Sequence, residues 1–276
     1  MSRAWLFVPG DRPERYDKAL AAGADQVIID LEDAVAPDYK ARARTLLMAW
    51  LGHTAARVAV RLNAADTGWF HDDLALLDLP AVVAIVLPKA EDPAVLAMLA
   101  ARRPGLALVP LVESAAGLAA VRAIATAPGV QRLAFGHLDF QVDLGLRDAA
   151  EDDLLPFRCE IVLASRLARI APPLDGVTAA LDDAERLAAD VARARRLGFG
   201  GKLCIHPKQV AGVRAGFAPA AAEIAWSRRL LDAAAAAGGA AVAVDGKMVD
   251  RPVMLRAEAI LRDAGEAGEA GASAGG

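Results

Sequence analysis

Leu106-Ala-Leu-Val-Pro-Leu-Val112 and Arg132-Leu-Ala-Phe-Gly136 are two short apolar runs, and each is followed by a carboxylate, Glu113 and Asp139 respectively. An apolar run bounded by Gly, Pro or Ser is typical of a strand that is buried on both faces. An acid at the C-terminal tip of such a strand lies where strands meet loops and ligands. The two carboxylates could therefore hold a hard cation, although Glu113-Ser114 could instead cap the helix that follows.

The same pattern recurs along the chain. Apolar runs at 5–8, 26–29, 57–60 and 82–87 each end in polar residues, and two weaker runs lie at 172–177 and 201–205. The polar residues after the first four runs are Pro9-Gly10-Asp11-Arg12, Asp30-Leu-Glu32-Asp33, Arg61-Leu-Asn63 and Pro88-Lys89-Ala-Glu91. Helical patterns between the runs occupy 13–23, 38–51, 92–102, 154–171 and 182–198. This alternation of strands and helices favours a parallel sheet.

Eight strand and helix units predict the α/β class and a closed TIM (β/α)8 barrel. The length of 276 residues suits one barrel of roughly 250 residues better than two small domains. In such barrels the chemistry gathers at the C-terminal ends of the strands. The polar residues predicted to lie there are Glu32, Asp33, Arg61, Lys89, Glu113, Asp139 and His206.

Composition narrows the class of protein. The chain is 55% hydrophobic and 24% charged, and its net charge of −4, without a basic stripe, argues against nucleic-acid binding. The longest apolar stretches are too short to span a membrane. No signal peptide precedes the first strand, and Cys159 and Cys204 form no CxxC motif. We therefore expect a cytoplasmic protein with two reduced cysteines.

Three regions are predicted. The barrel occupies 1–215, and an extension at 216–262 contains an alanine-rich helix, a hairpin and a last helix. The hairpin is predicted because Asp245-Gly246 lies between two short apolar runs. A lone hairpin is marginally stable in water, so we expect it to pack against another surface such as a neighbouring subunit. The tail at 263–276 contains only Asp, Ala, Gly, Glu and Ser and is predicted to be disordered.

Several motifs, taken together and in order, carry a resemblance to a known family. They are Leu6-Phe-Val-Pro-Gly-Asp-Arg-Pro13, Ile28-Ile-Asp-Leu-Glu-Asp-Ala-Val35, Val60-Arg-Leu-Asn63, Leu87-Pro-Lys-Ala-Glu91, Leu111-Val-Glu-Ser114, Phe135-Gly-His-Leu-Asp-Phe140, Cys204-Ile-His-Pro207 and Gly246-Lys-Met-Val-Asp250. The chain resembles the citrate lyase beta-subunit-like proteins, which include malyl-CoA and citramalyl-CoA lyases, over nearly all of 1–262. The resemblance implies a TIM barrel, usually a homotrimer, that binds Mg²⁺. It also implies that the protein cleaves or forms a carbon-carbon bond in a 3-hydroxyacyl thioester. Cleavage of this bond gives an acyl-CoA and a 2-oxo acid, and its formation joins them.

The resemblance assigns roles to individual residues. It makes Glu113 and Asp139 the direct Mg²⁺ ligands, with Glu32 and Asp33 reaching the metal through waters. Mg²⁺ prefers one or two carboxylates and keeps several waters, which agrees with this set. Arg61 would hold the oxo acid through its planar guanidinium. The alternative for Arg61 is a salt bridge to Glu32 or Asp33 at the strand end.

Two further sites follow from the resemblance. Asp250, on the C-terminal hairpin, would be the acid that protonates the enolate of the acyl thioester, although it could instead cap the last helix. The loop that contains Pro9 and Gly10 is similar to the loop that contacts CoA in this family. Arg12 and Lys18 could bind its phosphates, or they could be ordinary solvated charges.

The chain departs from the family pattern at one place. Many relatives have Phe-Gly-x-Glu-Asp where this chain has Phe135-Gly-His-Leu-Asp139. His137 could contact substrate, but a loop histidine bonded to the backbone is the preferred interpretation. The substrate thus stays open among malyl-CoA, citramalyl-CoA, a citryl thioester and another 3-hydroxyacyl-CoA, and an acyl carrier protein could replace CoA.

Two other classes of function compete with a CoA ester lyase. A metal-dependent 2-oxo-acid aldolase needs no CoA, but it typically carries a Glu-His pair where this chain has Glu32-Asp33. A non-catalytic thioester-binding subunit is the second alternative, because a fold does not fix a function. The presence of Arg61, Glu113, Asp139 and Asp250 argues against the second alternative.

Overall fold

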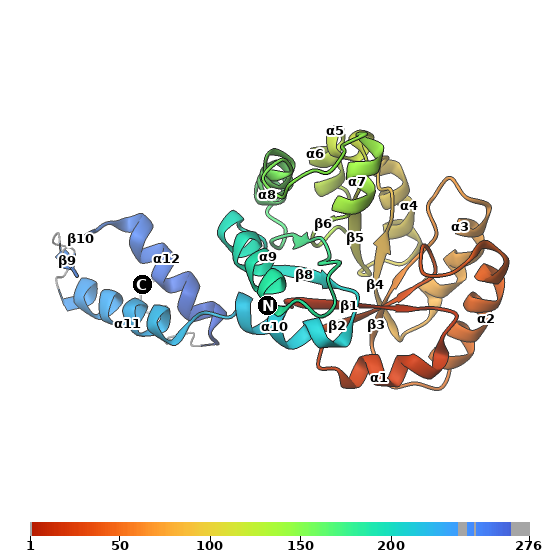
Figure 1. Cartoon of the computed structure of the whole chain (residues 1–276), viewed down its shortest axis with the longest axis horizontal. Helices are drawn as coiled ribbons and strands as arrows, with labels where there is room; N and C mark the ends of the chain where they lie inside the picture. The colour runs from red at the N-terminus through yellow and green to blue at the C-terminus, as the bar shows by residue number, and fades with distance from the viewer. Residues whose placement is uncertain (1, 237–241, 246, 266–276) are drawn as a thin grey trace, which may run out of the picture. The chain divides into compact units, whose positions relative to one another are not determined.

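The computed structural model describes residues 2–236, 242–245 and 247–265, and Figure 1 shows the whole chain. The chain divides into two compact units, with the boundary between Phe217 and Ala218. The predicted disordered tail falls almost entirely outside the described residues, which end at Gly265. No helix in these described segments is long and apolar enough to cross a membrane.

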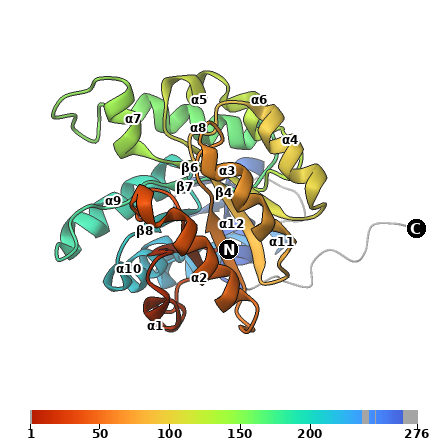
Figure 2. The ribbon, with the colours of Figure 1, turned by 90° about the vertical axis from the view of Figure 1, so that its right-hand side faces the viewer.

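The first unit is a closed parallel barrel of eight strands, which confirms the predicted fold. In chain order the strands are β1 (Ala4–Pro9), β2 (Gln26–Asp30), β3 (Val58–Arg61), β4 (Val82–Leu87), β5 (Ala107–Val112), β6 (Ala134–Phe135), β7 (Leu174–Asp175) and β8 (Gly201–Cys204). Each strand pairs with the next in sequence, and β8 closes the barrel onto β1 with Ala4 opposite Lys202. The helices lie around the strands (Figure 2).

Each of the five helical segments predicted for the barrel contains a helix, and further helices occur outside them. The helices are α1 (Tyr16–Ala21), α2 (Lys40–Leu51), α3 (Gly68–Asp73), α4 (Pro93–Arg102), α5 (Ala115–Ala119), α6 (Val121–Ala125), α7 (His137–Asp143), α8 (Leu155–Leu167), α9 (Ala184–Leu197) and α10 (Pro207–Phe217). The segment predicted at 154–171 ends early, because Arg169 takes a left-handed backbone conformation with φ of 57° and two prolines follow. Asp92 and Asp183 cap α4 and α9 with their side chains.

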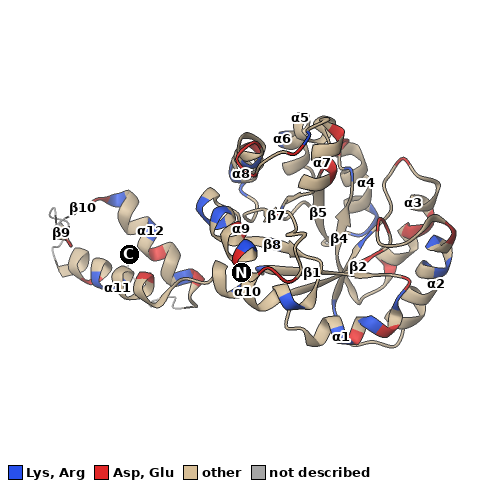
Figure 3. Cartoon of the chain, viewed as in Figure 1, with Lys and Arg blue, Asp and Glu red and all other residues tan. Residues whose placement is uncertain are grey.

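The core has two parts because successive strand residues point to opposite sides of the sheet. One set fills the barrel interior and includes Ile28, Val86, Val109 and Leu203. The larger set lies between the strands and the helices. Charged residues of both signs are interspersed along the surface helices (Figure 3).

The second unit contains a helical pair and a hairpin. Its elements are α11 (Ala221–Ala236), β9 (Val242–Val244), β10 (Lys247–Val249) and α12 (Arg251–Asp263). The strands β9 and β10 are antiparallel, with Lys247 opposite Val244, and Asp245 has φ of 50° as the turn requires. The predicted hairpin is therefore present, and the predicted last helix is α12, which Asp250 caps.

Candidate functional site

The polar side chains at the C-terminal ends of β2 and β3 form a cluster, here called the paired half, that consists of Asp30, Glu32, Asp33 and Arg61. Arg61 is the last residue of β3, and its guanidinium binds Asp30 in a two-point contact, Nε to Oδ1 at 2.7 Å and Nη2 to Oδ2 at 2.6 Å. Its Nη1 atom lies 2.9 Å from Glu32 Oε2 and 3.4 Å from Asp33 Oδ2. The predicted salt bridges of Arg61 to Glu32 and Asp33 are thus present.

Asp30 is the member of the paired half that sequence reasoning missed. Its Oδ1 also accepts the backbone N–H of Glu32 at 2.8 Å, and its Oδ2 accepts that of Ala34 at 3.2 Å. Asp30 therefore fixes both the guanidinium of Arg61 and the loop that carries Glu32. The position of Asp30 in the sequence could have indicated this role, because an acid at the end of a buried strand is expected to have a buried partner.

Three of the four charged groups of the paired half, Asp30, Glu32 and Arg61, are buried, whereas Asp33 is exposed. Burial works against the charge of Arg61, but Asp30, Glu32 and Asp33 hold its pKa above the usual value. The guanidinium also lies 4.7 Å from the ring centroid of Phe7. Burial raises the pKa of Glu32 to about 7, and the attraction of Arg61 opposes that rise.

The ends of β5 and β6 carry a second cluster, here called the open half, that consists of Glu113, His137 and Asp139. Oε1 of Glu113 accepts the backbone N–H of Lys89 at 2.7 Å, whereas Oε2 is buried and has no hydrogen-bond partner among the described residues. Burial and the nearby charge of Glu32 raise the pKa of Glu113 to about 8. The helix cap considered for this segment is supplied by Ser114, which accepts the N–H of Gly117 at 3.1 Å. The carboxylate of Glu113 is therefore left available.

Local sequence explains why the open half is compact. Gly136 joins β6 to α7, and a Cβ atom at this position would lie 2.6 Å from the Cβ of Glu113. Only glycine allows the two strand ends to approach so closely. Asp139 is exposed on the first turn of α7 and lines the same cavity as Arg61, Glu113 and His137. The cavity measures about 60 Å³.

His137 is not the backbone-bonded loop histidine that the sequence favoured. It opens α7, its side chain is buried, and Nδ1 has no hydrogen-bond partner within the described part of the chain. Burial lowers the pKa of His137 to about 4, so the ring is neutral near pH 7. A buried polar atom without a partner costs free energy, which a ligand that bonds to it can offset.

A divalent cation fits the open half. A buried carboxylate oxygen without a partner, next to a second carboxylate, is the environment that a hard cation stabilises. No group of three or more His, Cys, Asp or Glu side chains arranged to hold a metal occurs among the described residues. A site with only two carboxylates suits Mg²⁺, which binds few protein ligands and keeps water or substrate oxygens.

A larger cavity, of about 590 Å³, adjoins the end of β1. Pro9 and Lys18 line it, together with His206, which was predicted at a strand end, and two basic residues that were not predicted, Arg15 and Lys208. Gly10 and Arg12 are not among its lining residues, and Arg12 Nε lies 3.8 Å from Asp11 Oδ2. Tyr16 donates to the carbonyl of Gly10 at 2.6 Å, which fixes the loop.

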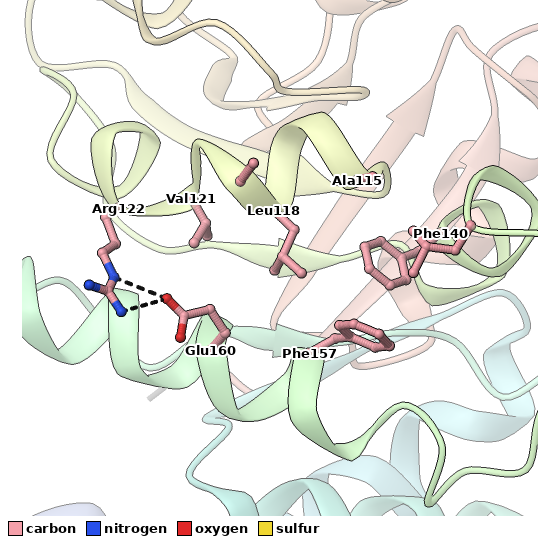
Figure 4. Close-up of a pocket in the computed structure, with 9 residues that line it drawn as sticks. Ala115, Leu118, Val121, Arg122, Phe140, Phe157 and Glu160 are labelled. Atoms are coloured by element: carbon pink, nitrogen blue, oxygen red, sulfur yellow. Dashed lines mark hydrogen bonds and ion pairs between the residues drawn. The ribbon is translucent and has the colours of Figure 1, made fainter.

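Another cavity, of about 550 Å³, lies between α5, α6, α7 and α8 (Figure 4). Its lining is mainly apolar, with Leu118, Phe140 and Phe157 among the residues that form it. The two charged residues in it, Arg122 and Glu160, satisfy each other at 2.9 Å. This cavity therefore offers no unpaired polar group for chemistry.

Asp250 belongs to the second unit. It is exposed, and its Oδ1 accepts the backbone N–H of Val253 at 3.1 Å at the start of α12. The cap that was considered for Asp250 is therefore present. Its role as an acid in catalysis stays a prediction.

Comparisons with known proteins agree with this geometry. The model of the HpcH/HpaI aldolase/citrate lyase family matches residues 3–207. The chain belongs to this family. A citrate lyase subunit beta-like protein of Deinococcus radiodurans is 39% identical over 277 residues, which cover 94% of this chain and 96% of that protein. The L-malyl-CoA/beta-methylmalyl-CoA lyase of Cereibacter sphaeroides is 35% identical, with 95% and 94% covered.

A solved structure of an HpcH/HpaI family member is also similar. The CitE protein of Mycobacterium tuberculosis, in complex with magnesium, acetoacetate and coenzyme A, superimposes with a TM-score of 0.83. It is 37% identical and covers 96% of this chain and 98% of its own. The predicted family and fold are thereby confirmed.

Proposed function

We propose that this protein is a Mg²⁺-dependent carbon-carbon lyase that acts on a 3-hydroxyacyl-CoA thioester of the malyl, citramalyl or citryl type. The products are an acyl-CoA and a 2-oxo acid. The observation that carries the proposal is the buried, unpaired Oε2 of Glu113 beside Asp139, in one cavity with Arg61. Relatives named for malyl-CoA cleavage, and a relative solved with magnesium and coenzyme A, support it.

Glu113 and Asp139 would hold the cation directly, and Glu32 and Asp33 would face it through waters. Bound there, Mg²⁺ supplies a Lewis acid that polarises the substrate oxygens at the bond to be broken. The two-point contact with Asp30 holds the guanidinium of Arg61 in one orientation. The Nη1 edge is the part that the oxo-acid carboxylate would meet, in place of the exposed Asp33.

In the cleavage direction, the reaction breaks the bond between the carbon that carries the hydroxyl and the α-carbon of the thioester. The hydroxyl gives up its proton to solvent, from which Asp250 later regains one, and becomes the carbonyl of the 2-oxo acid as the carbon-carbon bond breaks. The bonding electron pair moves to the α-carbon of the thioester as an enolate. Asp250 then donates a proton to that carbon, which completes the acyl-CoA.

The cavity of Pro9, Arg15, Lys18, His206 and Lys208 suits the CoA part of the substrate. Its size and its basic rim fit a phosphate-bearing cofactor of this kind. Lys208 is held by Asp182 at 2.6 Å, whereas Lys18 is exposed at the rim. We expect Lys18 to contribute a salt-sensitive contact to a phosphate.

We also propose that Asp250 acts in the barrel of a second copy, within a homotrimer. Asp250 lies outside the barrel unit, and the neighbouring Met248 on β10 is 75% exposed. A two-stranded hairpin alone is marginally stable in water, which favours its being covered by another surface. A carboxyl brought in from another chain would be desolvated at the interface without being buried in the core of its own barrel.

The lyase proposal is tested with a panel of CoA thioesters and Mg²⁺, with the free oxo acid trapped as a hydrazone. Malyl-CoA or citramalyl-CoA should release glyoxylate or pyruvate together with acetyl-CoA. Release of CoA thiol without an oxo acid would indicate thioester hydrolysis instead. Cleavage of a free hydroxy-oxo acid without CoA would indicate the aldolase, and no turnover of any substrate would favour a binding subunit.

The shared site is tested by complementation. Asp250→Asn keeps the helix cap, because Asn caps helices as well as Asp does, but it removes the acid. Asp250→Asn and Glu113→Gln should each be inactive alone, and a mixture under subunit exchange should recover part of the activity. A mixture that stays inactive after proven exchange contradicts the shared site. An active monomer contradicts it as well.

A further inference from the structure

We propose that His137 is a specificity-determining residue that contacts the oxo-acid part of the substrate and restricts it to the smallest 2-oxo acids. This inference rests on the proposed lyase function and names its substrate class more closely. His137 lines the cavity that also contains Arg61, Glu113 and Asp139. Its side chain is only 6% exposed.

The position of the imidazole is fixed on both sides. Its ring lies 6.2 Å from that of Phe135, centroid to centroid, and its other side meets Gly176 directly after β7. A Cβ atom on Gly176 would collide with Nδ1 and would lie 2.9 Å from Cε1, so residue 176 must be glycine for the ring to fit. The ammonium of Lys202 donates to the carbonyl of Gly176, which holds this wall in place. The ring therefore cannot move away to admit a larger ligand.

The hydrogen-bonding capacity of the ring is unused. The described residues supply no partner for Nδ1, and that atom is sealed against Gly176. A neutral imidazole has two nitrogens, one a donor and the other an acceptor. The nitrogen left to meet a ligand is therefore Nε2, and the ligand atoms that this cavity receives are oxygens of the oxo acid. A contact of this kind accounts for a buried histidine that the protein itself does not satisfy.

The bulk of the imidazole gives the direction of the selectivity. The cavity that His137 lines measures about 60 Å³. Phe7, Leu138 and Val177 supply other parts of the lining. The imidazole takes up space that a methyl group on the oxo acid would need. We therefore infer a preference for glyoxylate over pyruvate, and for malyl-CoA over citramalyl-CoA.

The experiment compares kcat/KM for malyl-CoA and citramalyl-CoA in wild type, His137→Ala and His137→Gln. Wild type should prefer malyl-CoA, and His137→Ala should lower the malyl to citramalyl ratio by at least tenfold, since one methylene is worth roughly tenfold or more. His137→Gln keeps most of the bulk and a hydrogen-bonding nitrogen, so it should retain most of the preference. His53→Ala, at an exposed histidine in the turn after α2, is the matched control and should leave the ratio unchanged.

A wild type without this preference, or a ratio in His137→Ala within twofold of wild type, overturns the inference while the lyase function stands. If wild type cleaves no thioester, the lyase proposal fails. The role of His137 is then tested by measuring the affinity of the protein for the two oxo acids. Calorimetry with Mg²⁺ should then give a glyoxylate to pyruvate affinity ratio that falls in His137→Ala. Equal ratios in the two proteins, or no binding of either oxo acid to wild type, would refute the assignment.

Discussion

The paired half and the open half of the barrel mouth contain similar residues but differ in how their polar atoms are satisfied. In the paired half, Asp30 and Arg61 form two short hydrogen bonds with each other, and the same carboxylate holds the following loop. In the open half, Oε2 of Glu113 and Nδ1 of His137 are buried, and the described residues offer neither atom a partner. The difference indicates that the contact between Asp30 and Arg61 is complete within the protein, whereas the open half is completed by ligands.

The largest expected effect is on catalysis in the open half. Glu113→Gln removes a charged metal ligand and should lower kcat/KM by at least about a thousandfold, because a Lewis acid contributes several kcal/mol and each 1.4 kcal/mol is tenfold. Steady-state kinetics with excess Mg²⁺ measures this loss. Glu160→Gln, in the apolar cavity outside the barrel, should remain close to wild type. Activity of Glu113→Gln within tenfold of wild type would contradict the claim that the open half holds the catalytic cation.

The next effect is on stability in the paired half. Asp30→Asn leaves the buried guanidinium of Arg61 without its main partner, and breaking a buried ion pair costs about 3–5 kcal/mol. Urea unfolding at pH 7 measures the free energy of unfolding. In the same assay Glu113→Gln should be neutral or stabilising, because it removes a buried carboxyl without a full set of partners. A loss below about 1 kcal/mol in Asp30→Asn would show that the paired half is not held by this contact.

The third effect is a dependence of stability on pH. In the folded protein without metal the pKa of Glu113 is about 8, above the value of 4.5 expected when unfolded. Between these values the folded state keeps a proton that the unfolded state has lost, so the free energy of unfolding falls as pH rises from about 4.5 to about 8. Glu32 acts in the same direction up to about pH 7. Since one unit of pKa difference is worth about 1.4 kcal/mol, the two contributions together are on the order of 5–10 kcal/mol.

Urea unfolding with EDTA at several pH values measures this dependence. Glu113→Gln should show a shallower fall than wild type over the same range, with the contribution of Glu32 remaining. Mg²⁺ should restore stability to wild type most strongly near pH 8. Identical slopes in the two proteins would show that Glu113 is not desolvated in the folded state.

The smallest effect concerns the loop of the paired half. Lys40, whose pKa is lowered mainly by burial, donates to the carbonyl oxygens of Leu31 at 2.9 Å and Glu32 at 2.7 Å. Lys40→Met keeps the volume but leaves these carbonyls without their donor, which should cost about 1–3 kcal/mol in urea unfolding. Lys18→Met, at an exposed position, should change stability by less than about 0.5 kcal/mol. Equal effects of both substitutions would contradict a structural role for Lys40.

Much of the barrel could be predicted from sequence, because each strand is a run of apolar residues that ends in polar ones. The same rule predicted Glu113, Asp139 and Arg61 at strand ends. Arg61 ends β3 and Glu113 directly follows β5, whereas Asp139 lies four residues after β6, on the first turn of α7. Asp30 was missed as the partner of Arg61, since a buried ion pair depends on which strand ends face each other. The strand register supplies this information, with Asp30 opposite Arg61 in β2 and β3.

The surroundings of His137 could not be predicted either. They depend on Gly176, which is far away in sequence but meets the imidazole because β6 and β7 are neighbours. The short strands β6 and β7 give a weak pattern, so neither their pairing nor the close approach at Gly176 was visible in the sequence. The fold of the second unit was predicted, but the role of Asp250 depends on a second copy of the chain.

The central claim is that the open half is a cation site that the protein leaves incomplete. Isothermal titration calorimetry of Mg²⁺ into wild type and Glu113→Gln at pH 7, in two buffers of different ionisation enthalpy, tests it directly. Wild type should bind one Mg²⁺ per chain and release close to one proton, because Glu113 is largely protonated before binding. Glu113→Gln should bind at least tenfold more weakly and release no proton. Equal affinity and equal proton release in both proteins would contradict the claim.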